Sequence, residues 1–168
     1  MKITEKKLNA KRRKVVADWV VETQSLVEEL QRPTTPEEWV DLVQQAVESW
    51  QAGSPPDYQG EVVLEDLHLL LGTVWGDQIC KVHGWEWVSL HFVYPGGKWD
   101  ADGIVSPDRS LYVLPYAHVL ECAGDPDIDV CIAGSLRVIG TSVVPRFPAK
   151  GYKDLMSGLR HIVPTNVR

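Results

Sequence analysis

The sequence lacks a long apolar run, a secretion signal and an even set of cysteines. Its longest apolar stretch near the start, residues 15–21, is interrupted by Asp18 and is far shorter than the roughly 20 residues that cross a bilayer. The start of the chain shows no apolar segment followed by a small-residue cleavage site. The three cysteines, Cys80, Cys122 and Cys131, are an odd number, which does not fit a disulfide framework. We therefore expect a cytoplasmic protein without a membrane span.

Common signatures of hydrolases and nucleotide-binding enzymes are also missing. The sequence contains no Gly-x-Ser-x-Gly, no His-Glu-x-x-His and no glycine-rich loop that ends in Gly-Lys-Ser/Thr. Cys80 and His83 form only a Cys-x-x-His fragment, without the second ligand pair of a structural zinc site. We expect no metal and no other cofactor. The enzymatic alternative is a hydrolase-type site in which Cys80 or Cys131 is the nucleophile and a histidine such as His83 holds the thiolate.

A calcium site is excluded by the residues that follow a promising aspartate spacing. Asp125, Asp127 and Asp129 are spaced like the first three ligands of a calcium loop. The sixth position is Val130, where the loop needs glycine, and the twelfth is Leu136, where it needs a bidentate glutamate. The three carboxylates are better explained by the positive N-terminal end of a following helix.

Charge is divided unevenly along the 168 residues. The chain has 17 basic and 23 acidic residues, a net charge of −6, yet residues 1–14 hold seven basic residues and only Glu5 as an acid. This segment therefore carries +6 and the rest −12. An acidic body repels nucleic acid and membrane surfaces and attracts basic partners. The basic segment could contact nucleic acid, but we favour a solvated first turn or a frayed tail.

Apolar spacing near 3.6 residues predicts three helices in the first half of the chain, at about residues 15–30, 36–50 and 61–83. Thr35-Pro36-Glu37-Glu38 supplies an N-cap hydroxyl, a proline in the first turn and a glutamate that can reach back. Gly84 suits the left-handed conformation that ends a helix.

The second half predicts an antiparallel meander followed by two helices. The strands are expected at residues 85–94, 98–105 and 110–114, and the helices at 115–124 and from 125 to about 139. Residues 141–168 are weakly patterned. Because helices and strands are segregated and do not alternate, we expect one α+β domain over residues 1–168, with N-terminal helices, a small meander of about three strands and two C-terminal helices.

Both faces of the first predicted strand carry apolar side chains. Trp85 and Trp87 share one face of the strand. Val88, Leu90 and Phe92 lie on the opposite face. We favour helices covering both faces. The alternative is that the tryptophan face is an exposed recognition patch.

One stretch resembles known families. Leu71-Gly72 is followed by Gly76-Asp77 and then by Trp87-Val88, a pattern that resembles several bacterial domain families of unknown function, some of them proposed as immunity proteins of polymorphic toxin systems. The resemblance covers residues 64–120 and implies a small binding domain with no established catalytic residues. Gly72 and Gly76 share a helix face, where the missing side chains allow close approach of another element.

The leading functional hypothesis is a non-enzymatic protein-interaction module that binds a basic protein partner. An immunity-like protein is one form of this hypothesis. Its expected binding residues, in turns of the meander, at the start of the following helix and on the tryptophan face, are Asp100, Asp102, Asp108, Asp125, Asp127, Asp129, Trp85 and Trp87. If the connections lie at one end of the domain, the six carboxylates form one negative patch. The alternative is that they only cap turns.

Overall fold

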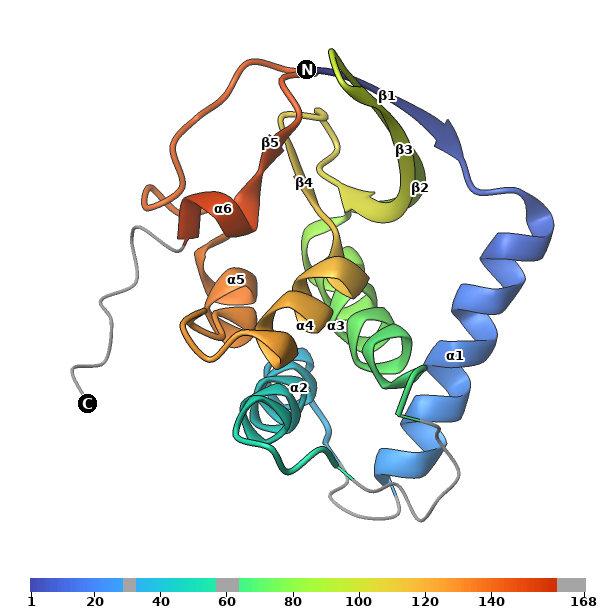
Figure 1. Ribbon diagram of the computed structural model, residues 1–168, viewed down its shortest axis with the longest axis vertical. Coiled ribbons are helices and arrows are strands. Elements are labelled where there is room, and N and C mark those ends of the chain that lie inside the picture. Colours follow the sequence, from blue (N-terminus) through green and yellow to red (C-terminus); the bar gives the residue numbers. More distant parts are fainter. Residues whose placement is uncertain (29–32, 57–63, 160–168) are drawn as a thin grey trace.

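The computed structural model describes residues 1–28, 33–56 and 64–159; in the first range, side chains are described for residues 1–22 only. The described residues form one five-stranded sheet and six helices (Figure 1). The strands are β1 (Lys2–Lys7), β2 (Glu86–Tyr94), β3 (Gly97–Val105), β4 (Leu111–Val113) and β5 (Lys153–Asp154). The helices are α1 (Ala10–Glu28), α2 (Pro36–Gln51), α3 (Leu67–His83), α4 (Pro115–Gly124), α5 (Ile132–Val138) and α6 (Leu155–Leu159). The expected α+β class is confirmed.

Local signals place the ends of two helices as predicted. At the start of α2, the Thr35 hydroxyl accepts the Glu38 N–H at 3.2 Å, and the Glu38 carboxylate accepts the Thr35 N–H at 3.2 Å. Gly84 ends α3 with a φ of 67°, and its N–H donates to the Cys80 carbonyl. The predicted start of this helix at residue 61 lies outside the described residues. Its described part begins at Leu67.

The sheet is larger than the expected three-stranded meander. Strands β2, β3 and β4 form that meander, while β1 pairs antiparallel with β2 and β5 pairs parallel with β4. The expectation of a frayed tail is therefore wrong for residues 2–7, which form β1, whereas residues 10–14 form the exposed first turn of α1, as the other expectation had it. Ile3 lies opposite Phe92 in the register and packs with the apolar side chains beneath it. The lysines of β1 suit an edge strand, because charge on an edge discourages pairing with other chains.

The C-terminal part differs from the prediction in two places. The helix expected from Asp125 begins only at Ile132. Before it, Asp125 accepts the Asp127 N–H in a local turn. Ile128 and Val130 then pack against the core without helical spacing. The weakly patterned segment after residue 140 supplies β5 and α6. Its short elements depend on contacts with β4 and the core, which local sequence does not reveal.

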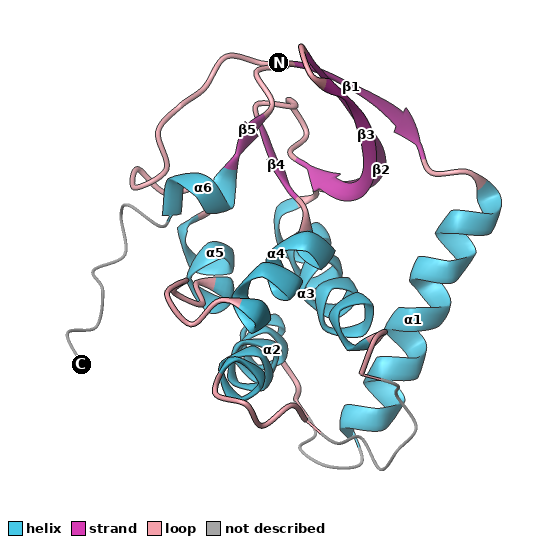
Figure 2. Ribbon diagram, in the orientation of Figure 1, coloured by secondary structure: helices cyan, strands magenta, loops and turns pink. Residues whose placement is uncertain are grey.

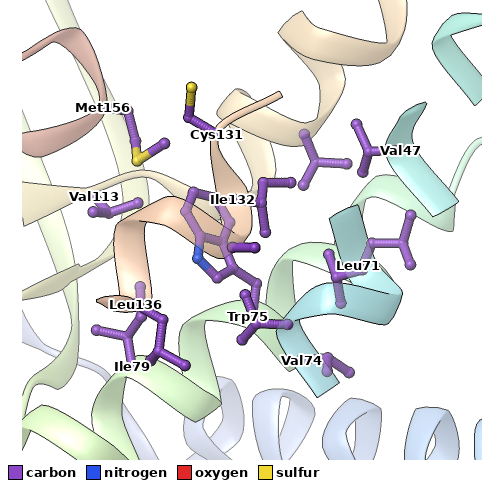
Figure 3. Close-up of a cluster of buried hydrophobic side chains, with 14 of the residues drawn as sticks. Val47, Leu71, Val74, Trp75, Ile79, Val113, Cys131, Ile132, Leu136 and Met156 are labelled. Atoms are coloured by element: carbon purple, nitrogen blue, oxygen red, sulfur yellow. The ribbon is translucent and has the colours of Figure 1, made fainter. Parts of the chain in front are cut away.

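Most of the buried side chains belong to a helical core at the end of the molecule opposite the sheet (Figure 2). Trp75 of α3 lies at its centre and donates from Nε1 to the Ser135 hydroxyl at 2.9 Å. Figure 3 shows Trp75 among side chains from α2, α5, β4 and α6, including Val47, Ile132 and Met156. Among the described residues, no helix combines the length and the apolarity needed to cross a membrane.

The sheet curls around a second, smaller core. This core contains Val88, Leu90, Phe92, Val105 and Tyr112, and the Phe92 ring stacks on Trp99 with centroids 4.5 Å apart. The face of β2 opposite the tryptophans is therefore covered by the curled sheet itself and by neighbours such as Tyr152. The expectation that helices cover both faces of this strand is wrong for this face.

Arg109 closes the curled sheet. Its Nε lies 3.0 Å from Oε1 of Glu5 on β1, and its Nη2 contacts Glu86 on β2. Its carbonyl accepts the Tyr152 N–H at 3.0 Å, just before β5. Burial, followed by the nearby Glu5 carboxylate, raises the pKa of Tyr152. The first and last strands are thus joined through one guanidinium and the turn that carries it.

Candidate functional site

Two of the aspartates expected in turns lie within a strand. Asp100 and Asp102 belong to β3, so their predicted placement in turns is wrong. The Asp102 carboxylate lies 2.6 Å from Nε of Arg12 at the start of α1, and its side chain is only 8% exposed. Asp100 pairs with Nδ1 of His91 across the sheet. Both carboxylates have partners within the chain.

Asp108 lies in the connection from β3 to β4, as predicted. It accepts the backbone N–H of Ser110 at 3.0 Å and the hydroxyls of Ser106 and Ser110 at 2.8 Å each. These hydrogen bonds, with the Ser110 N–H first, lower the pKa of Asp108. The residue therefore shapes its own turn.

The other three predicted aspartates, Asp125, Asp127 and Asp129, are exposed in the connection between α4 and α5. Gln51, the last residue of α2, holds this connection in place. Its Nε2 lies 2.8 to 2.9 Å from the carbonyl oxygens of Cys122, Asp125 and Ile128. This connection lies beside α2, whereas the connection from β3 to β4 lies at the sheet end (Figure 1). The six aspartates therefore do not form one patch.

Gln51 holds the α4–α5 connection against the end of α2, and α2 itself carries exposed Glu37 and Glu48 and the half-buried Asp41. We define the acidic face as Glu37, Asp41, Glu48, Asp125, Asp127 and Asp129. Arg137 of α5 pairs with Asp41 at 2.7 Å, and it is the one lysine or arginine in α2, α4, α5 and the connection. The sequence shows the charges, but the pairing of α2 with this connection depends on the fold.

The two tryptophans predicted to bind a partner face the helices. Trp85 is 6% exposed and belongs to the helical core. Trp87 is half-buried and stacks on Tyr116 of α4, with ring centroids 5.4 Å apart. The favoured interpretation, in which helices cover this face, is confirmed. Trp87 retains a partly exposed edge.

The cysteines do not form the arrangement of the enzymatic alternative. Burial, and secondarily Asp77, raises the pKa of Cys80 to about 12, so its thiol is protonated at neutral pH. His83 Nε2 lies 2.9 Å from the Leu136 carbonyl oxygen, and Cys131 is buried at the start of α5. The described residues contain no group of three or more His, Cys, Asp or Glu side chains that could hold a metal ion.

A cysteine and a histidine do meet on α4. Cys122 Sγ and His118 Nε2 are 3.5 Å apart, and both side chains are buried. His118 and Cys122 are four residues apart in a predicted helix, and this spacing was the sequence signal that could have indicated their contact. Burial within the helical core denies this pair access to a substrate.

Sequence reasoning missed a pocket of about 600 Å³ between α1 and the body of the molecule. Apolar side chains of α1 form one wall, α3 and β2 contribute Asp77, Lys81, Glu86 and Trp87, and the connection from β1 to α1 closes an end. The valines of α1 resemble an ordinary core-facing stripe in the sequence, and Val21 at 63% exposure shows that the stripe is only partly covered.

Comparison with protein-family models, curated proteins and solved structures found no match to this chain. The resemblance of residues 64–120 to immunity-like families therefore stays a prediction.

Proposed function

We propose that this protein is a non-enzymatic interaction module of the cytoplasm whose acidic face binds a basic protein partner. The observation that carries the proposal is the excess of acid on α2 and the α4–α5 connection, which carry the six carboxylates of the acidic face, while the one guanidinium of these elements and α5 is that of Arg137, which pairs with Asp41. Such a surface accelerates encounter with a positively charged partner and selects against acidic ones.

The acidic face is held in a defined shape before any partner arrives. Gln51 binds three carbonyl oxygens of the α4–α5 connection, and Gln44 of α2 accepts the Ala133 N–H at 2.8 Å. A rigid surface loses less conformational entropy on binding than a mobile one.

The cysteine chemistry supports binding over catalysis. A nucleophilic cysteine needs an accessible thiolate. The raised pKa of Cys80 and the burial of Cys131 and Cys122 work against this requirement. The specific form of the proposal is an immunity-like protein that binds a basic toxin, since some of the families that residues 64–120 resemble are proposed as immunity proteins.

The proposal is tested with two charge-reversed variants. Asp127→Lys with Asp129→Lys alters the acidic face at two exposed residues. Asp18→Lys with Glu22→Lys makes the same charge change on exposed α1 and is the matched control. Each protein is used for capture from lysate of the source organism, and a captured basic protein is then purified and titrated against each variant at increasing salt.

We expect the wild type and the α1 control to bind the same basic protein and the acidic-face variant to lose it. Salt should slow association, since exposed charges are screened beyond about 8 Å at physiological ionic strength. Equal binding by both variants, or no basic protein captured by the wild type, would contradict the proposal.

A further inference from the structure

The pocket between α1 and the body lies apart from the acidic face and has a different chemistry. Its α1 wall consists of Val16, Ala17, Val20 and Val21, to which Leu8 adds a further apolar side chain. Its volume of about 600 Å³ lies in the range of sites for small organic ligands, which are mostly apolar with a few polar groups.

The charges at the pocket leave a positive excess. The lining holds the three cations Lys7, Arg13 and Lys81 and two carboxylates, and so carries a net charge of +1. Lys81 Nζ lies 2.6 Å from Asp77, and Glu86 shares the Arg109 guanidinium with Glu5. Lys7 and Arg13 complete the charged lining, and neither forms an ion pair with a carboxylate in the described part of the chain.

Arg13 is positioned rather than neutralised. Its Nη1 donates to the Leu8 carbonyl oxygen at 2.8 Å, which fixes the guanidinium beside the end of β1 but leaves its charge uncompensated. Trp87 also contributes to the wall, while its Nε1 is buried and has no hydrogen-bond partner among the described residues.

We propose that this pocket binds a small amphipathic carboxylate, with its apolar body against the valines of α1 and its carboxylate at Lys7 and Arg13. Apolar burial supplies affinity, and the two cations give a preference for an anion over a neutral or cationic ligand of the same shape. The pocket shares no residue with the acidic face.

The probe is decanoate, titrated calorimetrically into the full chain. Acetate lacks the apolar body, and decyltrimethylammonium carries the opposite charge on a similar body. We expect decanoate to bind and both comparison compounds to bind at least tenfold more weakly. Absence of decanoate binding at millimolar concentration, or equal binding of decyltrimethylammonium, would overturn the proposal.

Three variants locate the binding. Ala17→Trp fills the pocket from an exposed position of α1 and should weaken decanoate binding at least tenfold. Lys7→Gln should weaken it about fivefold, the effect of one partly exposed ion pair. Lys98→Gln removes an exposed lysine outside the pocket and should leave affinity unchanged. Wild-type affinity in both Ala17→Trp and Lys7→Gln would overturn the assignment to this pocket, and circular dichroism verifies that each variant is folded.

Discussion

At Gly72, α3 lies close to the first turn of α4. A Cβ atom at this position would fall 3.0 Å from both the Pro115 carbonyl carbon and the Tyr116 nitrogen, and these backbone atoms cannot rotate away. At Gly76, one turn later, a Cβ would overlap the Trp87 ring. The sequence predicted close packing at both glycines. The structure identifies the neighbours as α4 for Gly72 and mainly β2 for Gly76.

Replacing Gly72 with alanine should therefore destabilise the fold, although alanine favours helices. Overpacking against the α4 backbone is expected to lower the free energy of unfolding by about 1–3 kcal/mol, measured by urea denaturation. Gly134 of α5 is the control, because a Cβ there meets no atom within 4 Å. Gly134→Ala should raise the free energy by up to about 1 kcal/mol through helix propensity. A Gly72→Ala variant as stable as the wild type would mean that α3 and α4 can separate.

Asp102 illustrates why individual site residues could not be predicted. In the sequence it resembles a turn residue within Asp100-Ala101-Asp102-Gly103, exposed to water. In the structure it is almost buried beneath Arg12, which is 90 residues away along the chain. Sequence spacing does not reveal such a contact. By contrast, Asp127 and Asp129 were predicted to be exposed, and they are.

The elements that the sequence predicted well contain their own boundary signals. Helix α2 has its capping box, α3 has Gly84, and α4 begins at Pro115. Strand β1 has no comparable signal, because four of its six residues are charged and its partner β2 lies about 80 residues later. Strand β5 is only two residues long and depends on β4. Long-range pairing, rather than propensity, determines these two strands.

Closure of the curled sheet depends on Arg109 in two separable ways. The guanidinium joins Glu5 and Glu86 and also donates from Nη1 to the Pro107 carbonyl at 3.0 Å. The backbone at Arg109 has a φ of 61°, a left-handed conformation in which a Cβ atom is strained. A substitution can therefore remove the charge while keeping or relieving the strain.

Arg109→Ala and Arg109→Gly should both lower the free energy of unfolding by at least about 1.5 kcal/mol, because charged hydrogen bonds are lost. The glycine variant should be the more stable of the two by about 1 kcal/mol, since glycine adopts a positive φ without steric cost. Arg146→Ala, at an exposed residue, is the control and should change little. Chemical denaturation measures all three. Equal stability of Arg109→Ala and the wild type would show that the sheet closes without this guanidinium.

At the scale of the whole molecule, the basic first segment and the acidic face lie on different elements. The basic segment that begins the chain is used in β1 and at the start of α1, where Arg12 contacts the sheet and Lys7 and Arg13 line the pocket. The acidic face lies on α2 and the α4–α5 connection. The division of charge into +6 and −12 was visible in the sequence. The placing of Lys7 and Arg13 at the pocket, and of six carboxylates on the acidic face, required the fold.

The two apolar cores should differ in stability. The helical core buries many more side chains than the sheet core, which holds five buried residues and depends on Arg109 for closure. Apolar burial is the main source of stability, and regions with less of it open more readily.

We therefore expect the Leu90 amide of β2 to exchange through an opening of lower free energy than the Ile79 amide of α3. Native-state hydrogen exchange at increasing denaturant measures both. The Leu90 opening should also show a smaller denaturant dependence, because less surface is exposed. Equal free energies and equal slopes for the two amides would mean that the sheet and the helices unfold as one cooperative unit, despite their separate cores.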